Sequence, residues 1–238
     1  GFQENGYEVI HCRVDPREHK GVSKFFLLVC EYFRIRQKFD LVIVAFPGHT
    51  VVWLARILFG RRIIFDAFVS LYNSNVFDRK LYSKYSIGGI KDWILDWHSA
   101  FLSKKVLLDT NAHINYFSKT FFINKNKFIR VFVGSDDTIF YPIKKEKSNN
   151  KFIVHFHGTY IPLQGIEYII EAANILKEHK DIVFNMIGNG QEYGKMKRLA
   201  HKLDVKNVNF VDKVGGEFVV KWMAEADVCL GIFGKTGK

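Results

Sequence analysis

The chain has 238 residues, of which 48% are hydrophobic and 25% are charged. This composition is typical of a globular protein and excludes a largely disordered chain, and the longest apolar runs, such as residues 40–46, are too short to cross a bilayer. The formal net charge of +11 favours partners that carry phosphate groups, although a Lys-rich, Asn-rich and Phe-rich composition bias explains it equally well.

The first half of the chain alternates short apolar runs with segments of helical period, which predicts βα repeats and a parallel sheet. Strands are predicted at residues 7–14, 41–46, 62–68, 105–109 and 128–133. Helices are predicted at residues 23–39 and 87–103, and the second places Ile90, Trp93, Ile94, Trp97 and Phe101 on one face. Asn5 and Gly6 are typical of a helix C-cap, so we expect that a helical segment preceded residue 1 and that a first strand and its loop are missing.

The pattern breaks at residues 134–142, and a polar, charged run follows at residues 144–150. It then restarts, with strands predicted at 151–157, 182–187, 207–211 and 227–233 and helices at 166–176, 192–203 and 217–225. We therefore expect two Rossmann-like domains, at residues 1–143 and 151–238, joined by a linker at 144–150. Because open α/β sheets bind ligands at the carboxyl ends of their strands, the loops at Gly158, Gly188, Asp212 and Gly234 are predicted to form the ligand-binding site.

Several of these loops resemble one protein family in their order and spacing. The segment Gly134-Ser-Asp-Asp-Thr-Ile-Phe-Tyr-Pro142 is similar to the NGVDxxxFxP junction of family 4 retaining glycosyltransferases, which have the GT-B fold. The resemblance continues through His157-Gly-Thr159, Pro162-Leu-Gln-Gly165, Met186-Ile-Gly-Asn-Gly190, Asn207-Val-Asn-Phe-Val211 and Ala226-Asp-Val228. It implies an α/β, GT-B fold of two Rossmann-like domains with parallel sheets, the second domain truncated at residue 238.

The resemblance also implies a reaction: transfer of a sugar, with retention, from a UDP- or GDP-sugar to a glycan or lipid-linked acceptor, in the setting of cell-surface polysaccharide synthesis. The growing charge on the departing diphosphate must be stabilised. The family's pattern places donor contacts at Gly158, Thr159, Gln164, Gly165, Gly188, Asn189, Gly190, Val211 and Val214. Tight turns are an alternative explanation of the glycines, and core packing of Val211. The nucleotide-sugar is a substrate, so no cofactor is expected.

The sequence departs from the family where an Arg usually follows the first loop glycine and a Lys precedes the last, because Thr159 and Gln164 stand there. Either the charge comes from elsewhere or activity is lost. Lys235, in the loop of residues 233–238, is a candidate replacement, the alternative being a solvated basic loop. We expect the 238-residue chain alone to transfer no sugar, and two glutamates eight apart to follow within about 20 residues of its end.

In the first half, Asp66 and His49 are the candidates for acceptor-side catalytic residues, since each lies at or after the end of a strand. A buried or capping role is the simpler explanation of Asp66, and N-capping near Thr50 is that of His49; Asp109 is similarly placed. His155 and His157 point the same way on their strand, but without a nearby third ligand they predict no metal site. Cys12, Cys30 and Cys229 are too scattered for disulfides or zinc and are expected to be reduced.

The aromatic helix at residues 87–103 and the acid-free basic stretch at 119–130 suggest an anionic membrane surface as a partner, a buried core face being the alternative. Because no secretory signal is visible, we expect a cytoplasmic location, extending to the inner face of the cell membrane. Two other functions stay open: a non-enzymatic nucleotide or nucleic-acid binder, and a GT-B nucleotide-sugar epimerase. No nucleic-acid partner is expected, since the basic residues are dispersed and no known nucleic-acid-binding motif is present.

Overall fold

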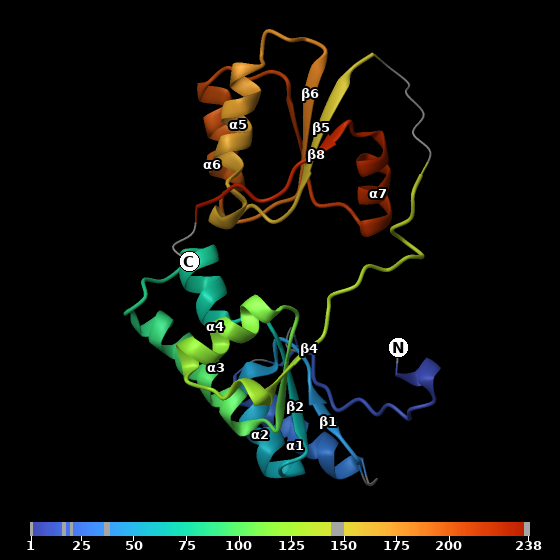
Figure 1. Ribbon diagram of the computed structural model, residues 1–238, viewed down its shortest axis with the longest axis vertical. Helices are drawn as coiled ribbons and strands as arrows, with labels where there is room; N and C mark the ends of the chain where they lie inside the picture. Colours follow the sequence, from blue (N-terminus) through green and yellow to red (C-terminus); the bar gives the residue numbers. More distant parts are fainter. Residues whose placement is uncertain (1, 16–17, 20, 36–38, 144–149, 236–238) are drawn as a thin grey trace. The chain divides into compact units, whose positions relative to one another are not determined.

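The computed structural model describes residues 2–15, 18–19, 21–35, 39–143 and 150–235. The chain forms two compact units (Figure 1). The first consists of Gly1–Leu71 and Ile90–Phe132, and the second of Tyr72–Gly89 and Val133–Lys238. Each unit contains one four-stranded sheet among its described residues, and every strand pair is parallel. This confirms the predicted α/β class with parallel sheets. The linker at 144–150 stays a prediction, and its residues 144–149 lie outside the described residues.

The first sheet follows the chain order β1-β2-β3-β4. Its strands are β1 (Val42–Val44), β2 (Ile63–Phe68), β3 (Lys105–Leu108) and β4 (Phe128–Arg130). The helices of this unit are α1 (Ser23–Arg34), α2 (Val52–Phe59), α3 (Ile87–Leu102), which begins in the second unit's Tyr72–Gly89 segment, and α4 (Asn111–Phe121). Alternate β2 residues, Ile63, Phe65 and Ala67, are fully buried in its core.

Residues 7–14 were predicted as a strand but form none. A strand is defined by its ladder partner, and the ladder of β1 pairs it with β2 alone among the described residues. The predicted C-cap is confirmed, because the short 3-10 helix η1 (Gln3–Asn5) ends at Gly6, which is left-handed with φ 80°. The helical segment expected before residue 1 stays a prediction.

In helix α3 the polar face is buried and much of the apolar face is exposed, which is the reverse of an ordinary surface helix. Its buried face carries Asp92, Asp96, Ser99 and Ala100, all at most 4% exposed. Its exposed face carries Ile87, Ile90, Ile94 and Phe101, which are 48–90% exposed. The predicted apolar stripe therefore exists, but its aliphatic members and Phe101 face outward, so most of it is not core.

The second sheet has the order β7-β6-β5-β8, in which the first strand of the unit, β5, lies between the second and the fourth. Its strands are β5 (Phe152–His157), β6 (Ile182–Ile187), β7 (Val208–Val211) and β8 (Val228–Cys229), the last being much shorter than the predicted 227–233. This is the order of a Rossmann half-sheet, and its topological switch point lies between β5 and β8.

Helices cover the two faces of the second sheet differently. Helices α5 (Ile166–Ile175) and α6 (Tyr193–Lys202) lie on one face, and α7 (Gly216–Glu225) lies on the other (Figure 1). Val154 and Phe156 of β5 join the hydrophobic core cluster with Ile166, Ile170 and Met196. Successive residues of a strand face opposite sides, so His155 and His157 lie on the α7 side.

Candidate functional site

The carboxyl ends of three strands of the second unit are joined by backbone hydrogen bonds that continue past the sheet. Gly158 N–H donates to the Ile187 carbonyl at 3.0 Å, and Gly188 N–H donates to the Val211 carbonyl at 2.9 Å. The loops that follow β5, β6 and β7 therefore start side by side. Together with the order of the strands, this places the predicted donor loops at the switch-point edge of the sheet.

Glycine is required where two of these loops touch. At Gly188 φ is 131°, and a Cβ there would lie 2.0 Å from the carbonyl oxygen of Gly158. No side chain fits at that distance, so the close approach of the loops after β5 and β6 depends on Gly188. Both explanations offered by the sequence, a tight turn and a close backbone approach, hold at this residue.

The loop after β8 packs on the first loop through a second backbone pair. Phe233 N–H donates to the Gln164 carbonyl and Gly234 N–H donates to the Leu163 carbonyl, both at 3.1 Å. Gly165 is left-handed at φ 63°, and a Cβ there would lie 2.4 Å from Gly234 N. Lys235 directly follows this contact and is exposed, so it lies beside the first loop. Residues 236–238, including Lys238, lie outside the described residues.

Tyr160, which the sequence did not identify, fastens the first loop to the second. Its backbone N–H donates to the Asn189 carbonyl at 3.0 Å, and its carbonyl accepts from Glu192 N–H at 3.0 Å. Its hydroxyl donates to the Met186 carbonyl at 3.2 Å, and its ring contacts Tyr193. The side chain is fully buried, and this burial raises the pKa of Tyr160. An aromatic residue two positions after the loop glycine was the signal that could have identified it.

The remaining predicted donor residues surround these contacts. Thr159, Asn189 and Gly190 are exposed, while Gln164, Val211 and Val214 are half-buried. Asn189 Oδ1 accepts from Gly190 N–H at 2.7 Å, which holds the second loop in a turn. The first loop, residues 158–165, contains no charged side chain and leads into α5, so it offers backbone N–H groups and the positive end of a helix dipole.

In the first unit, His49 lies in the short helix η2 (Gly48–Thr50) and is fully buried. Its Nε2 lies 3.2 Å from Asp96 Oδ1, and its ring packs edge-on against Phe65. The same carboxylate accepts from Ser70 Oγ at 2.6 Å and from Leu71 N–H at 3.1 Å. Asp96, which the sequence did not single out, therefore ties the loop after β1 and the end of the loop after β2 to α3.

The other acceptor-side candidates have separate surroundings. Asp66 is a half-buried residue of β2, in register with Leu107 of β3. Asp109 Oδ1 lies 2.5 Å from His113 Nδ1 on α4, and the neighbouring Thr110 caps that helix through the N–H of His113. The described residues contain no cluster of three or more His, Cys, Asp or Glu side chains suited to a metal ion.

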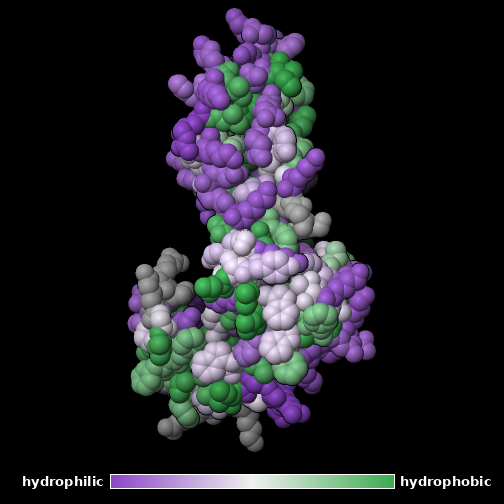
Figure 2. Space-filling view, turned by 90° about the vertical axis from the view of Figure 1, so that its left-hand side faces the viewer, coloured by the Kyte–Doolittle hydropathy of each residue, from purple (hydrophilic) through white to green (hydrophobic). Residues whose placement is uncertain are grey.

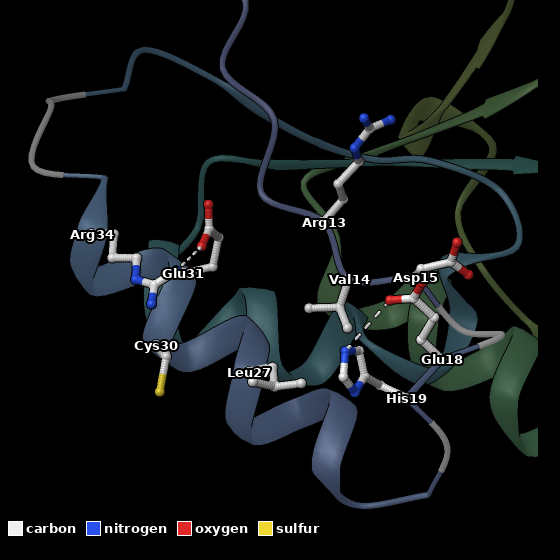
Figure 3. Close-up of a pocket in the computed structure, with 9 residues that line it drawn as sticks. All are labelled: Arg13, Val14, Asp15, Glu18, His19, Leu27, Cys30, Glu31 and Arg34. Atoms are coloured by element: carbon white, nitrogen blue, oxygen red, sulfur yellow. Dashed lines mark hydrogen bonds and ion pairs between the residues drawn. The ribbon is translucent and has the colours of Figure 1, made fainter.

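A cavity of about 230 Å³ lies in the first unit between residues 13–15, residues 18–19 and α1 (Figure 3). Its walls carry charges of both signs, and Arg34 contacts Glu31 at 3.5 Å while His19 lies 4.0 Å from Glu18. None of the predicted site residues lines it.

Comparisons with known proteins give a family match over part of the chain and identify the fold. Residues 137–230 match the family model described as Glycosyl transferases group 1. Among solved structures, Anabaena Alr3699/HepE in complex with UDP and glucose matches with a TM-score of 0.66 at 14% identity, over 86% of this chain and 55% of that one. The pneumococcal O-GlcNAc transferase GtfA, in complex with UDP and GlcNAc, matches with a TM-score of 0.62 at 12% identity, over 88% and 40%.

WaaG, a glycosyltransferase involved in lipopolysaccharide biosynthesis, matches with a TM-score of 0.56 at 17% identity, over 93% of this chain and 61% of WaaG. The chain thus spans 40–61% of the length of these three proteins. The search of curated proteins found no match. The likeness confirms the predicted GT-B fold.

Proposed function

We propose that this chain, which has the GT-B fold and whose residues 137–230 match the Glycosyl transferases group 1 model, acts as a retaining glycosyltransferase on a UDP- or GDP-sugar. The observation that carries the proposal is the backbone-bonded set of loops at the switch point, because the family match covers the loops after β5, β6 and β7. The acceptor is a glycan or lipid-linked sugar, and the setting is cell-surface polysaccharide synthesis in the cytoplasm.

The first loop performs the central task of stabilising the leaving diphosphate. Its backbone N–H groups and the first turn of α5 supply fixed donors, and such donors need no rearrangement as charge develops. The Thr159 hydroxyl and the Gln164 amide add neutral donors. Lys235, held next to this loop by the Phe233 and Gly234 hydrogen bonds, supplies a positive charge in place of the family's usual Arg and Lys.

The nucleotide base is assigned to the edge of the site formed by Val211 and Val214, and the donor sugar to the turn at Gly188–Gly190. Titration of the 238-residue chain with UDP, GDP, uridine and guanosine tests the proposal. We expect one diphosphate to bind saturably, and more tightly than its nucleoside. Absence of saturable binding by both diphosphates would refute the proposal.

The two alternatives give different results in the same assay. A nucleic-acid binder would bind single-stranded RNA at least as tightly as either diphosphate. An epimerase would interconvert the sugars of a UDP- or GDP-sugar and form no new glycosidic bond when an acceptor is present.

A second proposal concerns α3, whose exposed apolar face favours an anionic membrane surface. In Figure 2 aromatic and aliphatic side chains crowd one face of the first unit. Trp93, Trp97 and Phe101 stack along the helix, and Trp93 Nε1 donates to the Thr120 carbonyl. The basic stretch lies alongside, because Lys127 Nζ donates to the Phe101 carbonyl at 2.5 Å. No described helix is long and apolar enough to span a bilayer.

Cosedimentation with vesicles that contain anionic lipid tests this surface. We expect binding at low salt that falls at high salt, because salt screens the attraction between exposed lysines and anionic lipid headgroups. The double variant Ile90→Asn, Ile94→Asn should lose most of this binding. Ile175→Asn changes an isoleucine of the second unit that is 78% exposed, and should bind like the unchanged protein. Equal binding by both variants would exclude α3 as the contact.

A further inference from the structure

Two histidines of β5 form a hydrogen-bonded pair at the switch point. His155 is fully buried, whereas His157, the last residue of the strand, is exposed and directly precedes Gly158. His155 Nε2 lies 3.0 Å from His157 Nδ1. Both side chains are on the α7 side of the sheet, and β5 borders β8 across the switch point. His155 thus lies in the interior of the sheet, and its partner His157 lies at the edge where the first loop begins.

The surroundings of His155 determine which nitrogen carries the proton. His155 Nδ1 is enclosed and has no hydrogen-bond partner among the described residues. A buried N–H without an acceptor is rarer in proteins than a buried acceptor without a donor. Neutral His155 therefore keeps its proton on Nε2 and donates it to His157 Nδ1, which leaves the proton of neutral His157 on Nε2.

Electrostatics keep both rings neutral near pH 7. Burial, and secondarily the neighbouring His157, lower the pKa of His155 to about 4. Burial also lowers the pKa of His157. If His157 took up a second proton, its Nδ1–H would have to donate to His155 Nε2, which would move the proton of His155 onto the enclosed Nδ1. The pair therefore resists protonation and presents one N–H donor at the edge of the sheet.

We propose that His157 Nε2–H donates a hydrogen bond to the diphosphate of the nucleotide-sugar and that His155 is the positioning residue that fixes this tautomer. The inference rests on the proposed function. Three observations favour a phosphate as the acceptor: the place of His157 at the switch point, its exposure, and the absence of charged side chains from residues 158–165. A hydrogen bond from a neutral N–H to a charged phosphate is charge-assisted and stronger than one between neutral groups.

Matched variants of His157 separate this contact from a structural role. A glutamine side chain can place an N–H close to the position of Nε2, whereas alanine removes the donor. With the whole 238-residue chain we expect His157→Ala to weaken binding of the preferred diphosphate by about tenfold or more, and His157→Gln to retain most of the affinity. Binding of the corresponding nucleoside, which lacks phosphate, should change less than about twofold in both variants.

Nitrogen-15 NMR of the histidine rings tests the tautomers without any nucleotide. We expect proton-bearing Nε2 and bare Nδ1 on both residues at pH 7.5, and a mixture of tautomers at His157 in His155→Leu. A proton on Nδ1 of either ring would overturn the positioning role of His155. Diphosphate binding by the unchanged protein with no loss in His157→Ala would overturn the phosphate contact alone. Failure of the unchanged protein to bind UDP or GDP would overturn both this inference and the proposed function.

Discussion

The buried His155 should make the second unit sensitive to acid. The pKa of His155 is about 4 in the folded protein and about 6.5 in an unfolded chain, so the unfolded state binds more protons between these values. Above pH 6.5 His155 is neutral in both states, so keeping it neutral does not lower the free energy of unfolding. That free energy falls as the pH drops from 6.5 towards 4. Integrating over the range from pH 7.5 to pH 5 gives a loss of about 2 kcal/mol from this residue.

Tryptophan positions allow the second unit to be followed separately. Trp222 lies in α7, whereas Trp53, Trp93 and Trp97 belong to the first unit. Urea unfolding of fluorotryptophan-labelled protein, followed by the fluorine signal of Trp222, measures the free energy of unfolding at each pH. His155→Gln keeps a donor near Nε2 but does not titrate, so its stability should fall about 2 kcal/mol less over the same range. Parallel pH curves for the two proteins would refute the reasoning.

Three substitutions test other contacts. Gly188→Ala should destabilise the second unit by about 3 kcal/mol or more in the Trp222 assay, because its Cβ would lie 2.0 Å from the Gly158 carbonyl; Gly231→Ala, whose Cβ would meet nothing within 4 Å, should be near neutral. Asp96→Ala should cost the first unit about 3 kcal/mol by the Trp93 signal, since it leaves the Ser70 hydroxyl and the Leu71 N–H without their acceptor and removes the carboxylate beside His49, whereas the exposed Glu8→Ala should have little effect. Thr110→Ala should lower the helix content of α4 and the stability by about 1 kcal/mol, and Thr110→Ser should restore both.

Local patterns account for what could be predicted of the second unit. A glycine or an aspartate follows each of β5, β6 and β7, and parallel strands bring such ends to one edge, so the loops at Gly158, Gly188 and Asp212 could be placed together before their contacts were known. Tyr160 differs in this respect. Its position depends on hydrogen bonds to a loop more than 25 residues away, such as the bond to the Asn189 carbonyl, and no local pattern encodes those partners.

The first unit shows where periodicity stops being informative. The spacing of Ile90, Ile94 and Phe101 correctly predicts that these side chains share a face of α3, but spacing does not determine which face turns inward. Asp96 turns the polar face of α3 inward, because its carboxylate accepts hydrogen bonds from the Ser70 hydroxyl and the Leu71 N–H, about 25 residues earlier in the chain. The sequence shows only an Asp within an apolar helical segment and reveals neither its burial nor its hydrogen-bond donors. For the same reason the burial of His49 could not be separated from an acceptor-facing position.

The phosphate contacts proposed for the second unit differ in charge, and salt separates them. Lys235 is an exposed cation whose attraction to a diphosphate is screened as ionic strength rises, whereas a hydrogen bond from the neutral His157 ring involves no counter-ion on the protein side. The affinity lost in Lys235→Ala should therefore shrink between about 0.05 and 0.5 M salt, while the affinity lost in His157→Ala should stay nearly constant. Titrations of both variants with the preferred diphosphate at the two salt concentrations measure this. If the His157→Ala loss also vanished at high salt, His157 would act as a cation, and the tautomer argument built on the enclosed Nδ1 of His155 would be wrong.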